Sequence, residues 1–206
     1  LPDMNSLRQT RGVILTTKIN TFGAGESSVA EKLGDLMRRD RNPKVGTTVS
    51  DGIVAVRVRS EFLTRDDALR HMNDTIAQIE RMLGPIVFGR EEQMIQDGAI
   101  AMLRERGQTV VTAESCTGGL VGKMLTDVSG SSEVYQGGWV TYTNEMKTRM
   151  LGVDASAIDT HGAVSKPIAE AMALGALQHS HADYSLAITG IAGPTGGTPH
   201  NPVGTV

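Results

Sequence analysis

The stretch that decides the fold is Thr109–Lys123, "TVVTAESCTGGLVGK". Its first five residues are mostly β-branched and predict a buried strand, whereas the residues after Gly119 have the apolar periodicity of a helix. The polar turn between them is typical of a strand–turn–helix unit in an α/β domain. In such a unit the turn lies at the carboxyl edge of the sheet, toward which the free N–H groups of the following helix point.

Ser115 is the candidate nucleophile in this turn, and the spacing leaves two interpretations open. In the first, Ser115 or Thr117 caps the helix. In the second, Ser115 faces a ligand, because Gly118 and Gly119 let the backbone approach closely and the N–H groups near Thr117–Gly119 can hold an oxyanion. The turn follows the logic of a nucleophile elbow, although the G-x-S-x-G spacing is absent.

Cys116 is the rival nucleophile, and it is the only cysteine of the chain. A helix N-terminus lowers the pKa of a thiol. A lone cysteine beside a core strand is more often a small buried hydrophobe, however, and we favour that interpretation. A single cysteine also excludes an intramolecular disulfide and zinc sites built from two or four cysteines.

Strands and helices continue to alternate after residue 89, which predicts a three-layer α/β/α domain over residues 90–206. The glycine-rich segment 189–197, "TGIAGPTGG", follows its last strand and suits a backbone nest for phosphate. Within it, Thr189, Gly190 and Gly193 are candidate substrate-binding residues. The expected elements are helix 91–106, strand 109–113, helix 119–128, strand 137–144, short helices 145–151 and 154–160, helix 166–180 and strand 183–190.

A serine nucleophile needs a base, and Lys147 is the best-placed candidate. It follows the expected strand 137–144, so it should lie at the same sheet edge as Ser115, together with Tyr142 and Asn144. A desolvated lysine can act as a neutral base, but a solvated lysine in a first helical turn fits the same spacing. None of the histidines in this half is obviously partnered with a carboxylate. They are His161, His179, His181 and His200.

Residues 13–89 have a different pattern, which predicts a small α+β domain. A strand over 13–20 leads to a helix whose N-terminus is signalled by serines, in "GESS". Asp51-Gly52 indicates a two-residue hairpin between two further strands. Thr64 with Asp67 resembles a capping box before a long amphipathic helix, and "IVFG" after it suits one more short strand.

Composition and charge narrow the class of protein. Hydrophobic residues make up 39% of the 206 residues and charged residues 21%, which is ordinary for a globular protein. Residues 1–90 hold 14 Lys and Arg against 11 Asp and Glu, whereas residues 91–206 hold 6 against 12. The second half is therefore too acidic for a nucleic-acid surface. Because no apolar run approaches about 18 residues and no signal segment opens the chain, we expect a cytoplasmic protein without membrane association.

Four motifs occur in order over residues 91–206: "AESCTGG", "GSSEVYQGGWVTYTNEMK", "HGAVS" and "TGIAGPTGG…PVGTV". Together they resemble the CinA family (competence/damage-inducible proteins), specifically its C-terminal nicotinamide-nucleotide amidohydrolase domain. Residues 13–89, with "TFGAGES" and "RNPKVGTTVSDG", look like the KH-type middle domain of that family. Residues 1–12 resemble the end of the preceding molybdopterin-binding-like domain, so the expected boundaries are 1–12, 13–89 and 90–206.

The resemblance implies an activity and the residues that perform it. The reaction would be deamidation of nicotinamide mononucleotide to nicotinate mononucleotide and ammonia, without a metal or other cofactor, in a homodimer. Carried over residue by residue, Ser115 is the nucleophile, Lys147 the base, and Tyr142 supports the proton relay. Ser131 and Ser132 are expected close to the site, where either could bind phosphate or compete as nucleophile.

A second function class stays open beside the enzyme: a non-catalytic nucleotide-binding or scaffold protein linked to competence or DNA damage. Nucleic-acid binding by residues 13–88 is disfavoured, because an RNA-binding KH domain needs a G-x-x-G clamp and none is present there. A spacer or dimerisation role is preferred for this domain.

The resemblance also implies that material is missing at both ends of the chain. Family members continue beyond "PVGTV" into another strand and a basic loop, so the last domain is expected to be incomplete. The domain expected before residue 13 carries ADP-ribose pyrophosphatase activity in the family, and this chain is expected to lack that activity.

Overall fold

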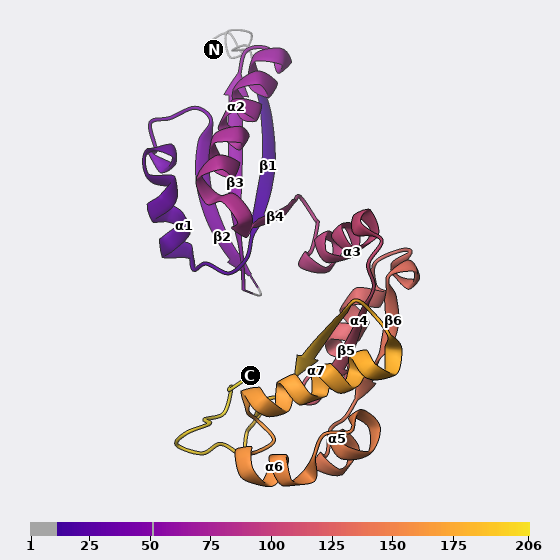
Figure 1. The fold of residues 1–206 in the computed structure, drawn as a ribbon. Helices are drawn as coiled ribbons and strands as arrows, with labels where there is room; N and C mark the ends of the chain where they lie inside the picture. Colours follow the sequence, from indigo (N-terminus) through magenta and orange to yellow (C-terminus); the bar gives the residue numbers. More distant parts are fainter. Residues whose placement is uncertain (1–11, 51) are drawn as a thin grey trace, which may run out of the picture. The chain divides into compact units, whose positions relative to one another are not determined.

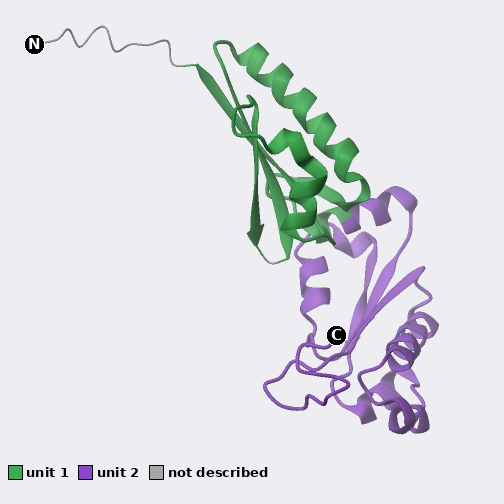
Figure 2. Ribbon diagram, turned by 90° about the vertical axis from the view of Figure 1, so that its left-hand side faces the viewer, with its two compact units in different colours: residues 1–98 green, residues 99–206 purple. Residues whose placement is uncertain are grey.

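The structure is a computed structural model that describes residues 12–50 and 52–206. The chain divides into two compact units, residues 1–98 and 99–206 (Figure 2). The division falls inside helix α3 (Ile95–Arg106), between residues 98 and 99 rather than at the expected boundary of 89–90. Apart from Gly12, the expected tail of a preceding domain lies outside the described residues.

The first unit is built on a four-stranded antiparallel sheet in the order β2-β3-β1-β4 (Figure 1). Helices α1 and α2 cover one face of this sheet, so the expected order of strands and helices is confirmed. The elements are β1 (Val13–Thr21), α1 (Glu26–Leu33), the 3₁₀ turn η2 (Gly34–Met37), β2 (Lys44–Ser50), β3 (Ile53–Phe62), α2 (Arg65–Leu83), the 3₁₀ turn η3 (Gly84–Ile86) and β4 (Val87–Arg90).

The two faces of this sheet differ because successive side chains of a strand point to opposite sides. One face is apolar and forms the core with the helices. The other face carries alternate residues such as Lys18 and Arg57 and has no helix on it. The buried core residues include Ile19, Val29, Leu33, Val45, Val54, Val56, Val58, Ile76, Ile79 and Leu83.

Turn and cap signals in this unit have mixed outcomes. Ser50 faces Ile53 in the register of β2 and β3, which confirms the two-residue hairpin, although Asp51 itself is not described. The Thr64 hydroxyl accepts a hydrogen bond from the Asp67 N–H at 3.1 Å, which confirms the cap of α2. The serine cap expected for α1 is wrong. Its N-cap is Gly25, because the helix begins at Glu26 and the serines already lie in its first turn.

The second unit is a three-stranded parallel sheet in the order β6-β5-β7, with helices on both faces. This is the expected three-layer α/β/α arrangement. Its elements are β5 (Val110–Glu114), α4 (Leu120–Thr126), the 3₁₀ turn η4 (Ser131–Glu133), β6 (Tyr135–Val140), α5 (Asn144–Leu151), α6 (Ala155–His161), α7 (Lys166–Ser180) and β7 (Tyr184–Ile188).

Strand β5 is the centre of this unit. Val111 and Ala113 face the core formed with α7, where Ile168 and Met172 are fully buried. On the opposite face, Val110 packs against a smaller core that includes Leu125 of α4. A parallel strand covered on both faces reads as a continuous buried run, as "TVVTA" does.

Two expected boundaries shift. Helix α3 begins at Ile95 rather than at 91, because the chain first turns and the Asp97 carboxylate accepts a hydrogen bond from the Met94 N–H at 2.7 Å. Its buried residue is Ile100, whereas Met102 is 52% exposed. Strand β6 ends at Val140, three residues before α5 begins at Asn144. In the described part of the chain, no helix has both the length and the apolar character needed to cross a membrane.

Candidate active site

Ser115 directly follows Glu114, the last residue of the central strand β5, so the strand delivers it to the carboxyl edge of the sheet. The Ser115 N–H continues the ladder toward β7 by donating to the Ile188 carbonyl at 2.9 Å. The residue is only 6% exposed. A sheet hydrogen bond and burial together hold this serine in a defined position.

Lys147 meets Ser115 from the neighbouring helix α5. Its Nζ donates hydrogen bonds to the Ser115 Oγ at 3.0 Å and to the Thr141 carbonyl at 3.1 Å. It is 1% exposed, and no carboxylate forms an ion pair with it among residues 12–50 and 52–206. A lysine held in this way is not the solvated first-turn residue that the spacing also allowed.

The electrostatic surroundings of Lys147 favour its neutral form. Burial lowers the pKa of its ammonium group below the usual 10.5, and the neighbouring Cys116 thiol opposes that shift. A lower pKa increases the fraction of neutral amine at a given pH, and the neutral amine is the form that can accept a proton.

Thr141 connects the two halves of this pair. Its N–H donates to the Glu114 carbonyl at 2.7 Å, while its carbonyl accepts from the Lys147 Nζ. The Thr143 hydroxyl then caps α5 by accepting from the Met146 N–H at 3.2 Å. The hydrogen bond from β6 to β5 and the start of α5 thus set the position of the lysine relative to the serine.

A pocket of about 230 Å³ opens beside the pair. Most of the sequence-predicted residues that follow β6 and β7 lie around it. Tyr142 is at its exposed rim, with 68% of its surface accessible. The Thr189 hydroxyl donates a hydrogen bond to the Ala163 carbonyl at 2.9 Å. The lining residues are Ser115, Cys116, Tyr142, Asn144, Lys147, Ala163, Val164, Thr189, Gly190 and Ala192.

Cys116 is half-buried and lines the pocket, so it is less buried than the small buried hydrophobe that we expected. A Cβ on Gly190 would come within 2.9 Å of the Cys116 Sγ, which shows how tightly the thiol packs against that glycine. Gly193, the other expected glycine of that loop, is not part of the lining.

Ser131 and Ser132 do not line this pocket, so the prediction that they lie close to the site is wrong. Both lie in η4, just before β6. The first residue of β6 is paired in register with Val110, at the beginning of β5, whereas Ser115 follows the end of that strand. Four residues of strand separate the two ends by about 13 Å, so the two serines lie at the opposite edge of the sheet.

The Glu114 side chain binds the N-terminus of α4, a role that the sequence patterns did not reveal. Its carboxylate accepts hydrogen bonds from the Gly122 N–H at 2.8 Å and the Val121 N–H at 3.0 Å. Neither Ser115 nor Thr117 caps the helix, whose N-cap is Gly119 without a side-chain cap. The capping interpretation is therefore wrong, and an acidic residue at the end of a strand before a helix was the signal that could have revealed the true cap.

Several groups act on the Glu114 carboxyl, which is 1% exposed. Burial alone would raise its pKa. The Thr117 hydroxyl and the two N–H groups stabilise the charged carboxylate and outweigh burial, so that the pKa lies below the usual 4.5. Glu114 thus ties the end of β5 to the start of α4 and closes the turn that carries Ser115.

Glu114→Gln is expected to lower the free energy of unfolding by about 1–3 kcal/mol at pH 7, because the new amide group brings an N–H donor against N–H donors in a buried place. Urea unfolding of the full chain measures this, with Glu105→Gln on the exposed surface as the matched control.

The effect of Glu114→Gln should depend on pH in a defined direction. Because the folded pKa of Glu114 lies below its unfolded value, the unfolded chain binds more protons in that range. The stability that Glu114 contributes is then complete above about pH 4.5 and is lost as the pH falls through the folded pKa. The gap between wild type and variant should narrow on acidification, and a gap that stays constant would show that Glu114 is not the ionised cap.

Comparisons with known proteins agree on one family. Residues 92–206 match the model of the CinA C-terminal domain, and residues 16–89 match that of the damage-inducible protein CinA KH domain. A CinA-like protein of Chlorobaculum tepidum is 42% identical over 92% of this chain and 45% of its own length. A CinA-like protein of a Synechocystis strain is 40% identical over 100% of this chain and 49% of its own length. The chain spans about half the length of these relatives.

Solved structures give the same answer. The competence/damage inducible protein CihA of Agrobacterium tumefaciens is 50% identical, with a TM-score of 0.52 over 53% of this chain and 66% of that chain. The competence damage-inducible protein A of Klebsiella pneumoniae is 36% identical, with a TM-score of 0.51 over 53% of this chain and 68% of that chain. With family models that together extend from residue 16 to residue 206, the chain belongs to the CinA family.

Proposed function

We propose that the chain is an amidohydrolase that converts nicotinamide mononucleotide to nicotinate mononucleotide and ammonia. The observation that supports this best is the 3.0 Å hydrogen bond between the Lys147 Nζ and the Ser115 Oγ, made by a buried lysine whose pKa is lowered. A nucleophile and a base within hydrogen-bond reach are the minimum that acyl transfer requires. The choice of substrate rests on the resemblance to the amidohydrolase domain of the family.

The first half of the proposed reaction forms an ester on Ser115. Neutral Lys147 takes the proton of the Ser115 hydroxyl while the Oγ attacks the carboxamide carbon of the substrate. The tetrahedral intermediate then collapses, the C–N bond breaks, and Lys147 gives its proton to the departing amine, so that ammonia leaves. Lys147 is neutral again, and the nicotinoyl group remains on Ser115.

Water completes the cycle. Lys147 takes a proton from a water molecule that attacks the ester carbon, and the second tetrahedral intermediate releases nicotinate mononucleotide. The proton on Lys147 returns to the Ser115 Oγ as the ester bond breaks. Every proton in this scheme passes through the one amine, so no histidine is needed.

The oxyanion requires N–H donors, and the start of α4 cannot supply all of them. The N–H groups of Val121 and Gly122 are taken by Glu114, and that of Gly118 by the Ser115 carbonyl. In the part of the chain that the structure describes, the backbone N–H groups of Cys116, Thr117 and Gly119 have no hydrogen-bond partner, and we assign the oxyanion to this group.

The remaining pocket residues would orient the substrate. The pocket volume suits the pyridine carboxamide end of the nucleotide, with Asn144 and Gly190 beside it. Tyr142 at the rim would contact the part of the nucleotide that extends outward. Its hydroxyl makes no hydrogen bond to Ser115 or Lys147 among the described residues, so its relay role needs substrate to be present.

The test is a stoichiometric assay of the full chain with nicotinamide mononucleotide. Ammonia, measured enzymatically, and nicotinate mononucleotide, measured by chromatography, should appear in a 1:1 ratio. Nicotinamide riboside, which lacks the phosphate, controls for recognition of the nucleotide end and should react more slowly. If the nucleotide binds but neither product forms, the non-catalytic nucleotide-binding class replaces this proposal.

A further inference from the structure

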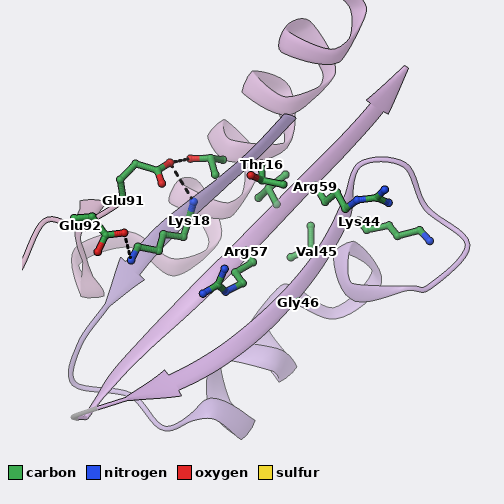
Figure 3. Close-up of a pocket in the computed structure, with 11 residues that line it drawn as sticks. Thr16, Lys18, Lys44, Val45, Gly46, Arg57, Arg59, Glu91 and Glu92 are labelled. Atoms are coloured by element: carbon green, nitrogen blue, oxygen red, sulfur yellow. Dashed lines mark hydrogen bonds and ion pairs between the residues drawn. The ribbon is translucent and has the colours of Figure 1, made fainter. Parts of the chain in front are cut away.

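The first unit has a hollow of about 490 Å³ on the helix-free face of its sheet. Figure 3 shows the side chains of β1, β2 and β3 that surround it. Four cations and two acids contribute to its lining. The lining residues used below are Thr17, Lys18, Lys44, Gly46, Arg57, Arg59, Glu91 and Glu92.

Like charges stand directly opposite each other in this face. The register places Lys44 of β2 across from Arg59 of β3, and Lys18 of β1 across from Arg57 of β3. In antiparallel pairs, side chains that are directly opposite lie about 5 Å apart, and like charges in such pairs destabilise the sheet. Two such pairs side by side favour a bound anion, because its charge would remove the repulsion.

Only part of this positive charge is neutralised within the unit. Lys18 forms an ion pair with Glu92 at 2.8 Å, and Arg59 with Glu61 at 2.9 Å. Arg57 donates a 3.3 Å hydrogen bond from its Nε to the Thr48 hydroxyl and forms no ion pair with any residue that the structure describes. Together with the hydrogen bond from Lys18, however, the charge of Arg57 helps to lower the pKa of Glu92. Lys44 makes no ion pair or side-chain hydrogen bond within residues 12–50 and 52–206.

Gly46 provides the space between these two cations. It stands opposite Arg57 in the ladder, two residues from Lys44 on the same face, and a Cβ built on it would meet nothing within 4 Å. The missing side chain leaves an opening in the face between the guanidinium and the ammonium. A phosphate group, which prefers several donors at once, suits such a place.

On the far side of the hollow, the backbone at Glu91 has an uncommon conformation. Glu91 has a φ of 53°, in the left-handed region that non-glycine residues rarely occupy, and its carboxylate accepts hydrogen bonds from the Thr17 hydroxyl and from the Lys18 N–H at 3.3 Å. The acids Glu91 and Glu92 thus confine the excess positive charge to the side of the hollow formed by β2 and β3.

We propose that this hollow is a binding site for a small phosphate-bearing molecule, with the phosphate between Lys44 and Arg57. The ligand is small rather than a single-stranded nucleic acid, because no aromatic side chain lines the hollow and stacking on aromatics is what holds single strands. Free phosphate and a phosphate ester share this chemistry, and the experiment separates them.

The experiment follows backbone amide signals of the ¹⁵N-labelled full chain by NMR during titration with ribose 5-phosphate, inorganic phosphate or ribose. Ribose 5-phosphate should shift the signals of Gly46 and Arg57 in a saturable way, whereas ribose should not. The double variant Lys44→Gln/Arg57→Gln should bind at least about tenfold more weakly. It should unfold at no lower urea concentration than wild type, because it removes two like-charge contacts. The matched control, Lys32→Gln/Arg81→Gln, removes one lysine and one arginine from the helices.

Each outcome decides the proposal. Equal affinity for inorganic phosphate identifies the free anion as the source, and tighter binding of ribose 5-phosphate identifies an ester; both support the site. The proposal is overturned if these signals do not move, if ribose moves them equally, or if the control variant weakens binding as much. It is also overturned if a single-stranded oligonucleotide displaces ribose 5-phosphate and binds more tightly.

Discussion

Replacing Ser115 with alanine is expected to lower kcat/KM for ammonia release from nicotinamide mononucleotide by at least about 10³-fold. This hydroxyl accepts a hydrogen bond from Lys147, and its loss removes the covalent route altogether. The substitution leaves the other residues that line the pocket unchanged, so the nucleotide should still bind. The measurement is initial-rate kinetics, together with the dissociation constant of nicotinate mononucleotide from calorimetry.

Matched variants separate Ser115 from the other candidate nucleophiles. Cys116→Ala tests the thiol that lines the same pocket, and Ser132→Ala tests a serine placed by the fold at the opposite edge of the sheet. Both should retain activity within a factor of about three of wild type. Full activity of the Ser115 variant, or loss of activity in the Ser132 variant, would mean that the nucleophile has been wrongly assigned.

Replacing Lys147 with methionine is expected to lower kcat by about 10²–10⁴-fold, the range for loss of a general base, while KM changes little. Methionine has a similar length and no charge, so it fills the buried space that the lysine chain occupies. Lys147→Arg should not restore the rate, because the guanidinium remains protonated and cannot accept the serine proton.

The pH dependence provides an independent check on the same residue. Because burial lowers the pKa of Lys147, the fraction of neutral amine grows as the pH rises through that lowered value, and kcat/KM should rise with it. The midpoint should fall clearly below 10.5. Lys123→Met, at an exposed lysine of α4, is the control and should leave the profile unchanged. A rising limb that persists in Lys147→Met would assign the base to another group.

The sequence predicted the order of the elements because each one carries a local signal. The alternation on β3, the Asp51-Gly52 turn and the Thr64 cap determine the first sheet and its long helix independently of anything distant. The run 109–113 likewise reads as a strand buried on both faces. Boundaries were less certain. The chain between Arg90 and Ile95 makes a turn with Glu91 in the left-handed region, which no residue preference at that position predicts.

The site was predictable where the ends of strands determine it, and it was harder to predict where hydrogen bonds within the folded turn do. Ser115 and Lys147 both follow parallel neighbouring strands, so their meeting follows from topology. The role of Glu114 does not, because its N–H partners lie seven and eight residues later and only the closed turn brings them within reach. The placing of Ser131 and Ser132 failed for the opposite reason: they are near the site in the sequence, but η4 precedes β6 instead of following it.

Thr141 shows how insertions and deletions should be distributed in relatives of this chain. The Thr141 N–H donates to the Glu114 carbonyl, and the Thr141 carbonyl accepts from the amine of Lys147, six residues later. An added or deleted residue between Val140 and Lys147 would rotate α5 by about 100° and turn the amine away from Ser115. Length changes should therefore be absent from this connection, whereas the exposed segment 194–200, which supplies no residue to the pocket, is free to vary in length.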